Sequence, residues 1–172
     1  MKIFVTTMSL VLLSSMAILF TACGYKQSSK YARAIIGESV STSVTISPQD
    51  PENTVLIKDA VDSAIIEVFH ASLTTKNLSE SHLDLSIGDP SYSPIQYDSD
   101  GYIIAYRATI SMNIVRHKKE ISKKYVTQGS YDFSVVANAV LTDQERFDAI
   151  RFSASKALKS FISHVSAEGA RK

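Results

Sequence analysis

Residues 102–115, YIIAYRATISMNIV, have the clearest two-residue periodicity in the chain. Apolar or aromatic residues occupy every even position, and polar residues occupy the odd positions from 107 to 113. This alternation predicts a β-strand with one face in the core and the other facing water or a partner. On the core face we expect Tyr102, Ile104, Tyr106, Ala108, Ile110, Met112 and Ile114. On the opposite face we expect Arg107, Thr109, Ser111 and Asn113.

Three other segments alternate in the same way. Residues 38–46 (ESVSTSVTI) place serine and threonine opposite aliphatic residues, and residues 81–89 (SHLDLSIGD) form a shorter example. Residues 124–137 (KYVTQGSYDFSVVA) predict a fourth strand, in which Gly129 is a candidate β-bulge. Residues 88–101 (GDPSYSPIQYDSDG) contain two prolines and an Asp-Gly pair, which predicts a loop.

Two segments have the three- and four-residue spacing of amphipathic helices. The first covers about residues 54–73, with apolar positions at Ile57, Val61, Ala64, Ile65, Val68 and Phe69. The second covers residues 142–165, with an apolar stripe at Phe147, Ile150, Ala154, Leu158, Phe161, Ile162 and Val165. It opens with Thr142 and Glu145 at the spacing of a capping box.

The predicted order is strand, helix, three strands, helix. Each amphipathic helix needs an apolar surface, and one face of a four-stranded sheet is wide enough for both. We therefore expect an α+β two-layer sandwich, with a four-stranded, mostly antiparallel sheet and two long helices on one face. A chain of 172 residues with 18 basic and 17 acidic residues fits one domain without a global electrostatic field.

The first 22 residues differ in composition from the rest. Lys2 is followed by an apolar run that ends in small residues, as in a secretory signal peptide. The run is too short, and too often interrupted by Thr and Ser, for a membrane-spanning helix. We predict a signal peptide at 1–22, a polar tether at 23–31 and a single periplasmic domain at 32–172.

Cys23 is the only cysteine, and it follows the apolar run directly. The stretch LFTAC resembles a bacterial lipobox, whose cysteine becomes the acylated first residue of the mature protein. This use of Cys23 excludes disulfides and cysteine-based catalysis or metal binding in the mature chain. By resemblance to lipoprotein sorting signals, Gly24 favours the outer membrane, with the acyl chains as the membrane contact.

The sequence has no recognisable catalytic motif. Nucleophile-elbow, dinucleotide-binding, Walker and zinc-protease patterns are absent, and the four histidines have no ligand spacing. Acidic residues such as Asp84 and Asp89, which flank a strand, are expected to be solvated charges. We therefore expect no enzyme, no cofactor and no bound metal.

Basic residues gather in the connection RHKKEISKK, residues 116–124. The cluster consists of Arg116, His117, Lys118, Lys119, Lys123 and Lys124. One interpretation is a solvated sheet edge protected from aggregation by lysines. The other is an anion site in which Arg and Lys contact phosphate groups. Nucleic acid is not an expected partner, because no aromatic residues are interleaved with the charges.

These features together resemble the LptE family of lipopolysaccharide-assembly lipoproteins. The resemblance includes Cys-Gly-Tyr at 23–25, the serine-rich strand, both long helices and the segment DPSYSPIQYDSDGYIIAYRATISM. Within that segment, Tyr97, Gly101, Tyr106 and Arg107 follow the spacing Y-x-x-x-G-x-x-x-x-Y-R.

The resemblance implies a lipoprotein that plugs the outer-membrane β-barrel for lipopolysaccharide (LPS) transport, helps assemble it and binds LPS. It would face the periplasm or lie inside the barrel lumen. The barrel-contact candidates are Arg107, Thr109, Ser111 and Asn113. The LPS-phosphate candidates are Arg116, Lys118, Lys119, Lys123 and Lys124. The alternative is an accessory lipoprotein of another envelope complex, either a transport auxiliary or an activator of a cell-wall synthase.

Overall fold

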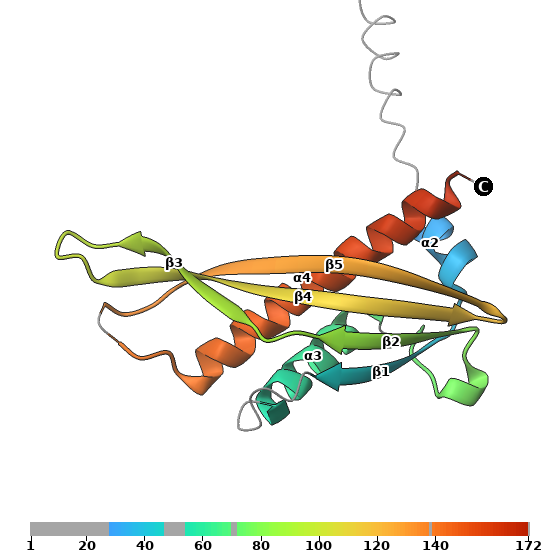
Figure 1. The fold of residues 1–172 in the computed structure, drawn as a ribbon, viewed down its shortest axis with the longest axis horizontal. Coiled ribbons are helices and arrows are strands. Elements are labelled where there is room, and N and C mark those ends of the chain that lie inside the picture. Colours follow the sequence, from blue (N-terminus) through green and yellow to red (C-terminus); the bar gives the residue numbers. More distant parts are fainter. Residues whose placement is uncertain (1–27, 47–53, 70–71, 138, 172) are drawn as a thin grey trace, which may run out of the picture.

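The computed structural model describes residues 28–46, 54–69, 72–137 and 139–171. It is an α+β sandwich in which a twisted sheet lies against long helices (Figure 1). The elements in chain order are α2 (Ser28–Ile36), β1 (Val40–Ile46), α3 (Thr54–Phe69), the 3-10 helix η3 (Lys76–Leu78), β2 (Ser81–Ile87), β3 (Ser91–Tyr97), β4 (Ile103–Lys118), β5 (Ile121–Ser134) and α4 (Asp143–Gly169).

The strand β4 organises the sheet. One edge of β4 pairs with β5, antiparallel, from Ala105–Ser134 to Lys118–Ile121. The other edge is shared, because β2 pairs with the second half of β4 and β3 with the first half. β1 joins β2 in parallel and forms the far edge. The predicted sandwich with a mostly antiparallel sheet is confirmed.

The sheet has five strands among the described residues, so the prediction of four was wrong. The additional strand, β3, lies in the segment predicted to be a loop. Pro94 has no N–H to donate, but an edge strand tolerates proline because one of its edges is unpaired. Most β3 side chains are exposed, so burial imposed no alternating pattern that the sequence could have revealed.

The core lies between one face of the sheet and the helices α3 and α4 (Figure 1). As predicted, Ala108, Ile110, Met112 and Ile114 of β4 face this core and are fully buried. Leu158 and Phe161 of α4 pack against them in the same cluster. The prediction was wrong for Tyr102, which precedes β4 and is 48% exposed, and Ile104 and Tyr106 are only partly buried, because the helices do not cover this end of the strand. Side chains at odd positions of β4 lie on the opposite face. None of the helices formed by the described residues covers that face (Figure 1).

Gly129 belongs to a regular ladder and not to a β-bulge. It pairs with Ile110, and the register of β4 and β5 is unbroken on both sides. A Cβ at this position would overlap the backbone carbonyl oxygen of Ser153 and lie 2.5 Å from the backbone nitrogen of Ala157. The glycine therefore allows α4 to approach the sheet closely.

The helix ends partly match the predictions. The capping box of α4 is present, with Glu145 N donating to Thr142 Oγ1 at 3.2 Å and Thr142 N donating to Glu145 Oε2 at 2.8 Å. The first long helix ends at Phe69, earlier than predicted, and Leu73 instead forms an isolated bridge with Val40.

The N-terminal predictions fall mostly on residues outside the described ranges. α2 begins at Ser28, within the segment predicted to be a tether. The signal peptide and Cys23 precede the described residues and stay predictions. Within the described ranges, no helix combines the length and apolar character needed to cross a membrane.

Candidate functional site

The basic cluster lies at one end of the sandwich, where β4 and β5 form a hairpin. Lys119 and Glu120 make its two-residue turn, and Lys119 adopts the left-handed conformation with a φ of 54°. The strands separate the cluster between two faces, because successive side chains point to opposite sides. Arg116, Lys118 and Lys123 share the helix-covered face, whereas Lys124 lies on the open face.

Arg116 is part of the interior at this end of the fold. Its residue surface is 5% exposed, and Nη1 donates to the Ile35 carbonyl oxygen of α2 at 3.2 Å. Its Nε has no hydrogen-bond partner in the structure. Burying a guanidinium costs free energy when one of its N–H groups has no hydrogen-bond acceptor. Arg116 therefore connects β4 to α2 by one hydrogen bond, and its Nε–H group has no acceptor among the described residues.

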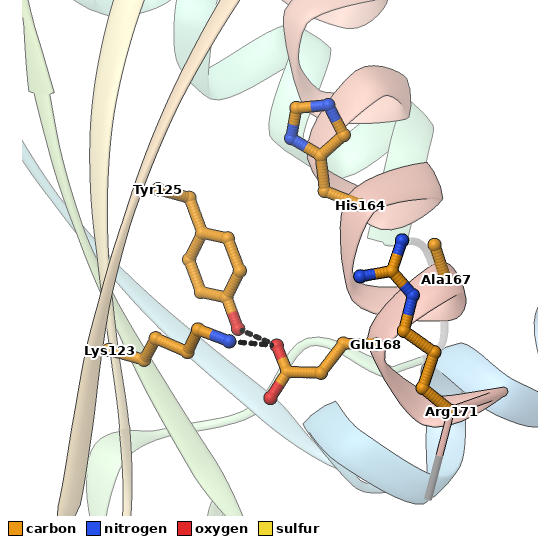
Figure 2. Close-up of a pocket in the computed structure, with 6 residues that line it drawn as sticks. All are labelled: Lys123, Tyr125, His164, Ala167, Glu168 and Arg171. Atoms are coloured by element: carbon orange, nitrogen blue, oxygen red, sulfur yellow. Dashed lines mark hydrogen bonds and ion pairs between the residues drawn. The ribbon is translucent and has the colours of Figure 1, made fainter.

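Lys123 reaches across to the last turn of α4 (Figure 2). Its Nζ lies 2.7 Å from Glu168 Oε2, and Tyr125 Oη donates to the same oxygen at 2.8 Å. The hydrogen bond from Lys123, followed by that from Tyr125, holds the pKa of the Glu168 carboxyl below its usual value. Burial, followed by the hydrogen bond to Glu168, raises the pKa of the Tyr125 hydroxyl.

Two neighbouring hollows open at this end. The larger is about 590 Å³ and is lined by Lys123, Tyr125, His164, Ala167, Glu168 and Arg171 (Figure 2). The smaller is about 260 Å³ and shares Lys123 and Glu168 with it. Its other lining residues are Ala34, Ile35, Arg116, Lys118, Lys119 and Ile121.

The lysines of the cluster differ in whether their ammonium groups already have partners within the protein. Lys123 is engaged with Glu168, and Lys118 Nζ makes one long contact, 3.5 Å, with the Ala34 carbonyl oxygen. Lys119 and Lys124 are exposed and form no ion pair with the described residues. An incoming anion would therefore meet Lys118, Lys119 and Lys124 first.

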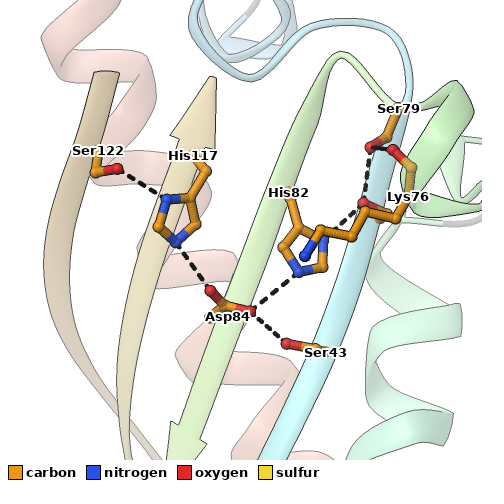
Figure 3. Close-up of polar contacts among 8 residues, drawn as sticks. Ser43, Lys76, Ser79, His82, Asp84, His117 and Ser122 are labelled. Atoms are coloured by element: carbon orange, nitrogen blue, oxygen red, sulfur yellow. Dashed lines mark hydrogen bonds and ion pairs between the residues drawn. The ribbon is translucent and has the colours of Figure 1, made fainter. Parts of the chain in front are cut away.

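A second polar constellation crosses the open face of the sheet at the same end (Figure 3). Asp84, on β2, accepts a hydrogen bond from Ser43 and contacts two histidines. Asp84 Oδ1 lies 3.0 Å from His82 Nε2, and Asp84 Oδ2 lies 2.8 Å from His117 Nε2. These contacts link β1, β2 and β4 through one carboxylate.

The constellation extends further on both sides of Asp84. His82 Nδ1 lies 2.8 Å from Ser41 Oγ, which lies 2.7 Å from Ser79 Oγ. His117 Nδ1 lies 2.8 Å from Ser122 Oγ on β5. The hydrogen bond from Ser43, followed by the charge of His82, lowers the pKa of the Asp84 carboxyl.

The prediction of Asp84 as a solvated charge missed this network. The available signal was the pair His82 and Asp84, two residues apart on a strand that alternates, because such residues share a face. The partners on β1 and β4 depend on strand register, which the sequence alone did not provide.

The arrangement resembles two Ser-His-Asp relays with a common carboxylate, but its geometry is that of a structural network. Ser41 is 3% exposed, so its hydroxyl is closed to a substrate. Nucleophilic catalysis also requires donors that stabilise an oxyanion, and no such set converges with Ser41 or Ser122 among the contacts described above. Within the described residues, no group of three or more His, Cys, Asp or Glu side chains is placed to hold a metal ion.

The four predicted barrel-contact residues lie on the open face of β4. Ser111 and Asn113 are exposed and Thr109 is half-buried. Arg107 forms a two-pronged ion pair with Asp132 of β5, with both N–O distances at 2.7 Å. This pairing holds the pKa of the Asp132 carboxyl below its usual value. On the open face, β4 therefore presents small polar groups and an arginine whose charge is neutralised by Asp132.

One protein family matches most of the chain. A family model described as LptE, lipopolysaccharide-assembly, matches residues 41–165, from β1 almost to the end of α4. That range contains all but the first residue of the sheet, all of α3 and α4 up to its last turn. The chain belongs to the LptE family. No curated protein matches this LptE-family chain significantly.

Several solved lipoproteins match this chain at low sequence identity and with TM-scores below 0.5. A candidate lipoprotein from Caulobacter crescentus CB15 is 11% identical with a TM-score of 0.45, over 84% of this chain and 99% of that one. A minor lipoprotein from Acinetobacter baumannii is 8% identical with a TM-score of 0.43, over 76% and 92% of the two chains. Rare lipoprotein B from Shewanella oneidensis is 10% identical with a TM-score of 0.35, over 76% and 91%.

Proposed function

We propose that this LptE-family protein is a non-enzymatic outer-membrane lipoprotein that occupies the LPS-transport β-barrel, assists its assembly and binds LPS. The family match over residues 41–165 carries the proposal. Acylation at Cys23 would attach the protein to the membrane. Lipopolysaccharide and the barrel are the proposed partners, and no cofactor or metal has a part in this function.

The open face of the sheet supports contact with a barrel wall. A water-filled barrel has a polar interior, and the exposed Ser111 and Asn113 offer hydrogen-bonding groups to such a surface. The network around Asp84 fixes the neighbouring side chains by contacts between strands. A surface whose polar groups are held in place loses little side-chain entropy on binding.

The basic end supports binding of LPS phosphates. Lys118, Lys119 and Lys124 retain available charge, as described above. Arg116 and Lys123 contribute in another way, because the buried guanidinium and the Lys123–Glu168 pair shape the hollows beside the hairpin. Charge-assisted contacts between lysine and phosphate are strong where water is partly excluded.

A detergent pull-down of the acylated protein from outer membranes tests the barrel partner. We expect one large β-barrel protein to co-purify in near-equal amount. Replacing Ser111 and Asn113 by Lys should reduce that recovery, whereas the same change at Ser160, on α4, should not. Recovery of a cell-wall synthase or a different transporter component, without a barrel, would overturn the proposal in favour of an accessory role.

Charge variants test LPS binding separately. The triple variant Lys118→Gln, Lys119→Gln, Lys124→Gln should bind LPS at least tenfold more weakly in a detergent competition assay. The matched control Lys58→Gln, Lys156→Gln, Lys159→Gln removes the same charge from α3 and α4. Equal affinity of the two triple variants would contradict the role of the basic end.

A further inference from the structure

The predicted anchor point is close in sequence to one particular end of the sandwich. Only residues 24–27 separate Cys23 from Ser28, the first residue of α2. Fully extended, that connection spans at most about 18 Å between the two Cα atoms. The nine residues of α2 add about 13 Å. An acyl anchor on Cys23 therefore holds α2 near the membrane surface.

α2 lies near the hairpin end of β4 and β5 (Figure 1), and side-chain contacts connect the two. Arg116 donates to the Ile35 carbonyl oxygen at 3.2 Å, and Lys118 Nζ lies 3.5 Å from the Ala34 carbonyl oxygen. The C-terminal turn of α4 joins them, because a Cβ on Gly169 would lie 2.7 Å from the Tyr31 carbonyl oxygen. The end of the fold that the short connection can reach is the basic end.

The surface at this end combines positive charge with an exposed apolar side chain. Lys119 and Lys124 form no ion pair with the described residues, and Ile121, next to the turn, is 64% exposed. Arg116 adds a positive charge just beneath this surface, where it lines the smaller hollow and is 5% exposed. Basic residues beside an aliphatic side chain bind anionic lipid headgroups, since the charges attract the headgroups and the apolar group enters the boundary region.

The opposite end of the β4–β5 ribbon has the reverse charge. The segment 88–102, which includes β3 and its turn into β4, contains three aspartates and no Lys or Arg. The 16 residues of β4 make the two ends about 50 Å apart. An anionic surface would attract the basic end and repel this one.

We propose that the basic end docks on the anionic phospholipid headgroups of the leaflet that holds the Cys23 acyl chains. The docking is a second membrane contact beside the anchor, and it sets the orientation of the sandwich, with the β3–β4 turn pointing away from the membrane. It rests on the acylation of Cys23 proposed above and not on binding to the barrel, and it uses the same lysines, Lys118, Lys119 and Lys124, that are proposed above to meet LPS phosphates.

The test uses the full acylated protein in phosphatidylethanolamine vesicles, with and without phosphatidylglycerol. Because the chain has a single cysteine, which the acyl group occupies, Ile121→Cys or Ser99→Cys supplies a unique thiol for a fluorophore. A nitroxide on a lipid headgroup quenches a fluorophore that lies at the membrane surface. We expect strong quenching at position 121 and little at position 99, only with phosphatidylglycerol present.

The triple variant Lys118→Gln, Lys119→Gln, Lys124→Gln tests the charges that carry the docking. Each lysine near an anionic surface strengthens binding about fivefold, so we expect quenching at position 121 to fall to the level at position 99. The control triple variant at Lys58, Lys156 and Lys159 should quench as the unmodified protein does.

Retention on vesicles in about 1 M salt, where exposed charges are screened, reports the acyl anchor separately. Loss of retention would overturn the acylation and the docking together. Retention with equal quenching at both ends, or with quenching that survives the first triple variant, would overturn the docking alone. Quenching that requires LPS in place of phosphatidylglycerol would also overturn it, while the LPS binding proposed above would stand.

Discussion

The two ends of the β4–β5 ribbon are built on the same pair of strands but are stabilised in different ways. At the basic end the ribbon is covered by α2 and by the last turns of α4 (Figure 1). Buried side chains such as Phe161 and Tyr125 meet there, with ring centroids 5.1 Å apart. At the other end, β3 and its turn into β4 extend beyond α3, and Tyr97 and Tyr102 are 56% and 48% exposed.

The difference shows that the two ends of one sheet can contribute unequally to the stability of the fold. The helix-covered end depends on tight packing and fixed polar contacts. The β3–β4 end depends on aromatic contacts among residues that are only partly buried, such as Tyr131 against Phe152 at 4.7 Å between centroids. Substitutions at the two ends should therefore have different consequences for the free energy of unfolding.

Replacing Phe161 by Ala should give the largest effect. The side chain is fully buried between α4 and β5, and its loss should lower the free energy of unfolding by about 3–5 kcal/mol. Tyr97→Ala, at the exposed end, should change it by less than about 0.5 kcal/mol. Urea denaturation measures both. Similar losses in the two variants would contradict the proposed difference between the ends.

Replacing Gly129 by Ala tests the contact between α4 and the middle of the ribbon. The added methyl group would overlap backbone atoms of α4, so we expect a loss of about 3 kcal/mol. The control is Gly88→Ala, where a Cβ meets no atom within 4 Å. A Gly129→Ala protein as stable as the Gly88→Ala protein would show that α4 does not approach the sheet as described.

Replacing Thr142 by Ala removes the cap of α4 near the β3–β4 end. The free energy of unfolding should fall by about 1 kcal/mol, since the backbone N–H of Glu145 loses its acceptor. Thr142→Ser retains the hydroxyl and should restore most of that loss. Equal stability of the Ala and Ser variants in thermal unfolding would contradict the capping role.

Replacing Glu168 by Gln should have the smallest effect at neutral pH, under about 1 kcal/mol for a partly exposed ion pair. The folded state lowers the pKa of Glu168, so its contribution is present above the unfolded pKa of about 4.3 and is lost as the pH falls through the folded value. The stability difference between Glu168→Gln and the unmodified protein should therefore shrink below pH 4.

A constant stability difference across that pH range would show that the Glu168 carboxylate is not held by Lys123 and Tyr125. Glu120→Gln, at the nearby hairpin turn, is the matched control, because Glu120 makes no ion pair with the described residues. Its stability should follow the unmodified protein at every pH.

The sequence was most informative where burial constrained it. The central strand and the two long helices have a buried face, and the resulting periodicity predicted the sandwich. β3 was missed because exposure at an edge removes that constraint, and Pro94 argued against a strand. Gly129 was misassigned because the requirement for glycine comes from Ser153 and Ala157 of α4, which lie more than 20 residues further along the chain.

The candidate site was predictable only in part. The charge of the hairpin was evident, and the alternation of β4 and β5 could have separated its residues into two faces. The burial of Arg116 was hidden, because it depends on α2, a helix that was not predicted and that begins within the predicted tether at 23–31. The network around Asp84 combines side chains from four strands, and register alone brings these together.

The parallel pairing of β1 with β2 has a consequence for folding if the chain is exported, as the predicted signal peptide implies. Val40 of β1 is opposite Ser81 of β2, so about 40 residues must follow β1 out of a translocation channel before its partner appears. β2 in turn pairs with β4, whereas β4 and β5 are joined by a two-residue turn and can pair as soon as both have emerged. On a chain exported from its N-terminus, we expect β1 to remain unpaired for longer than the other strands. It would then be the segment that periplasmic chaperones need to protect.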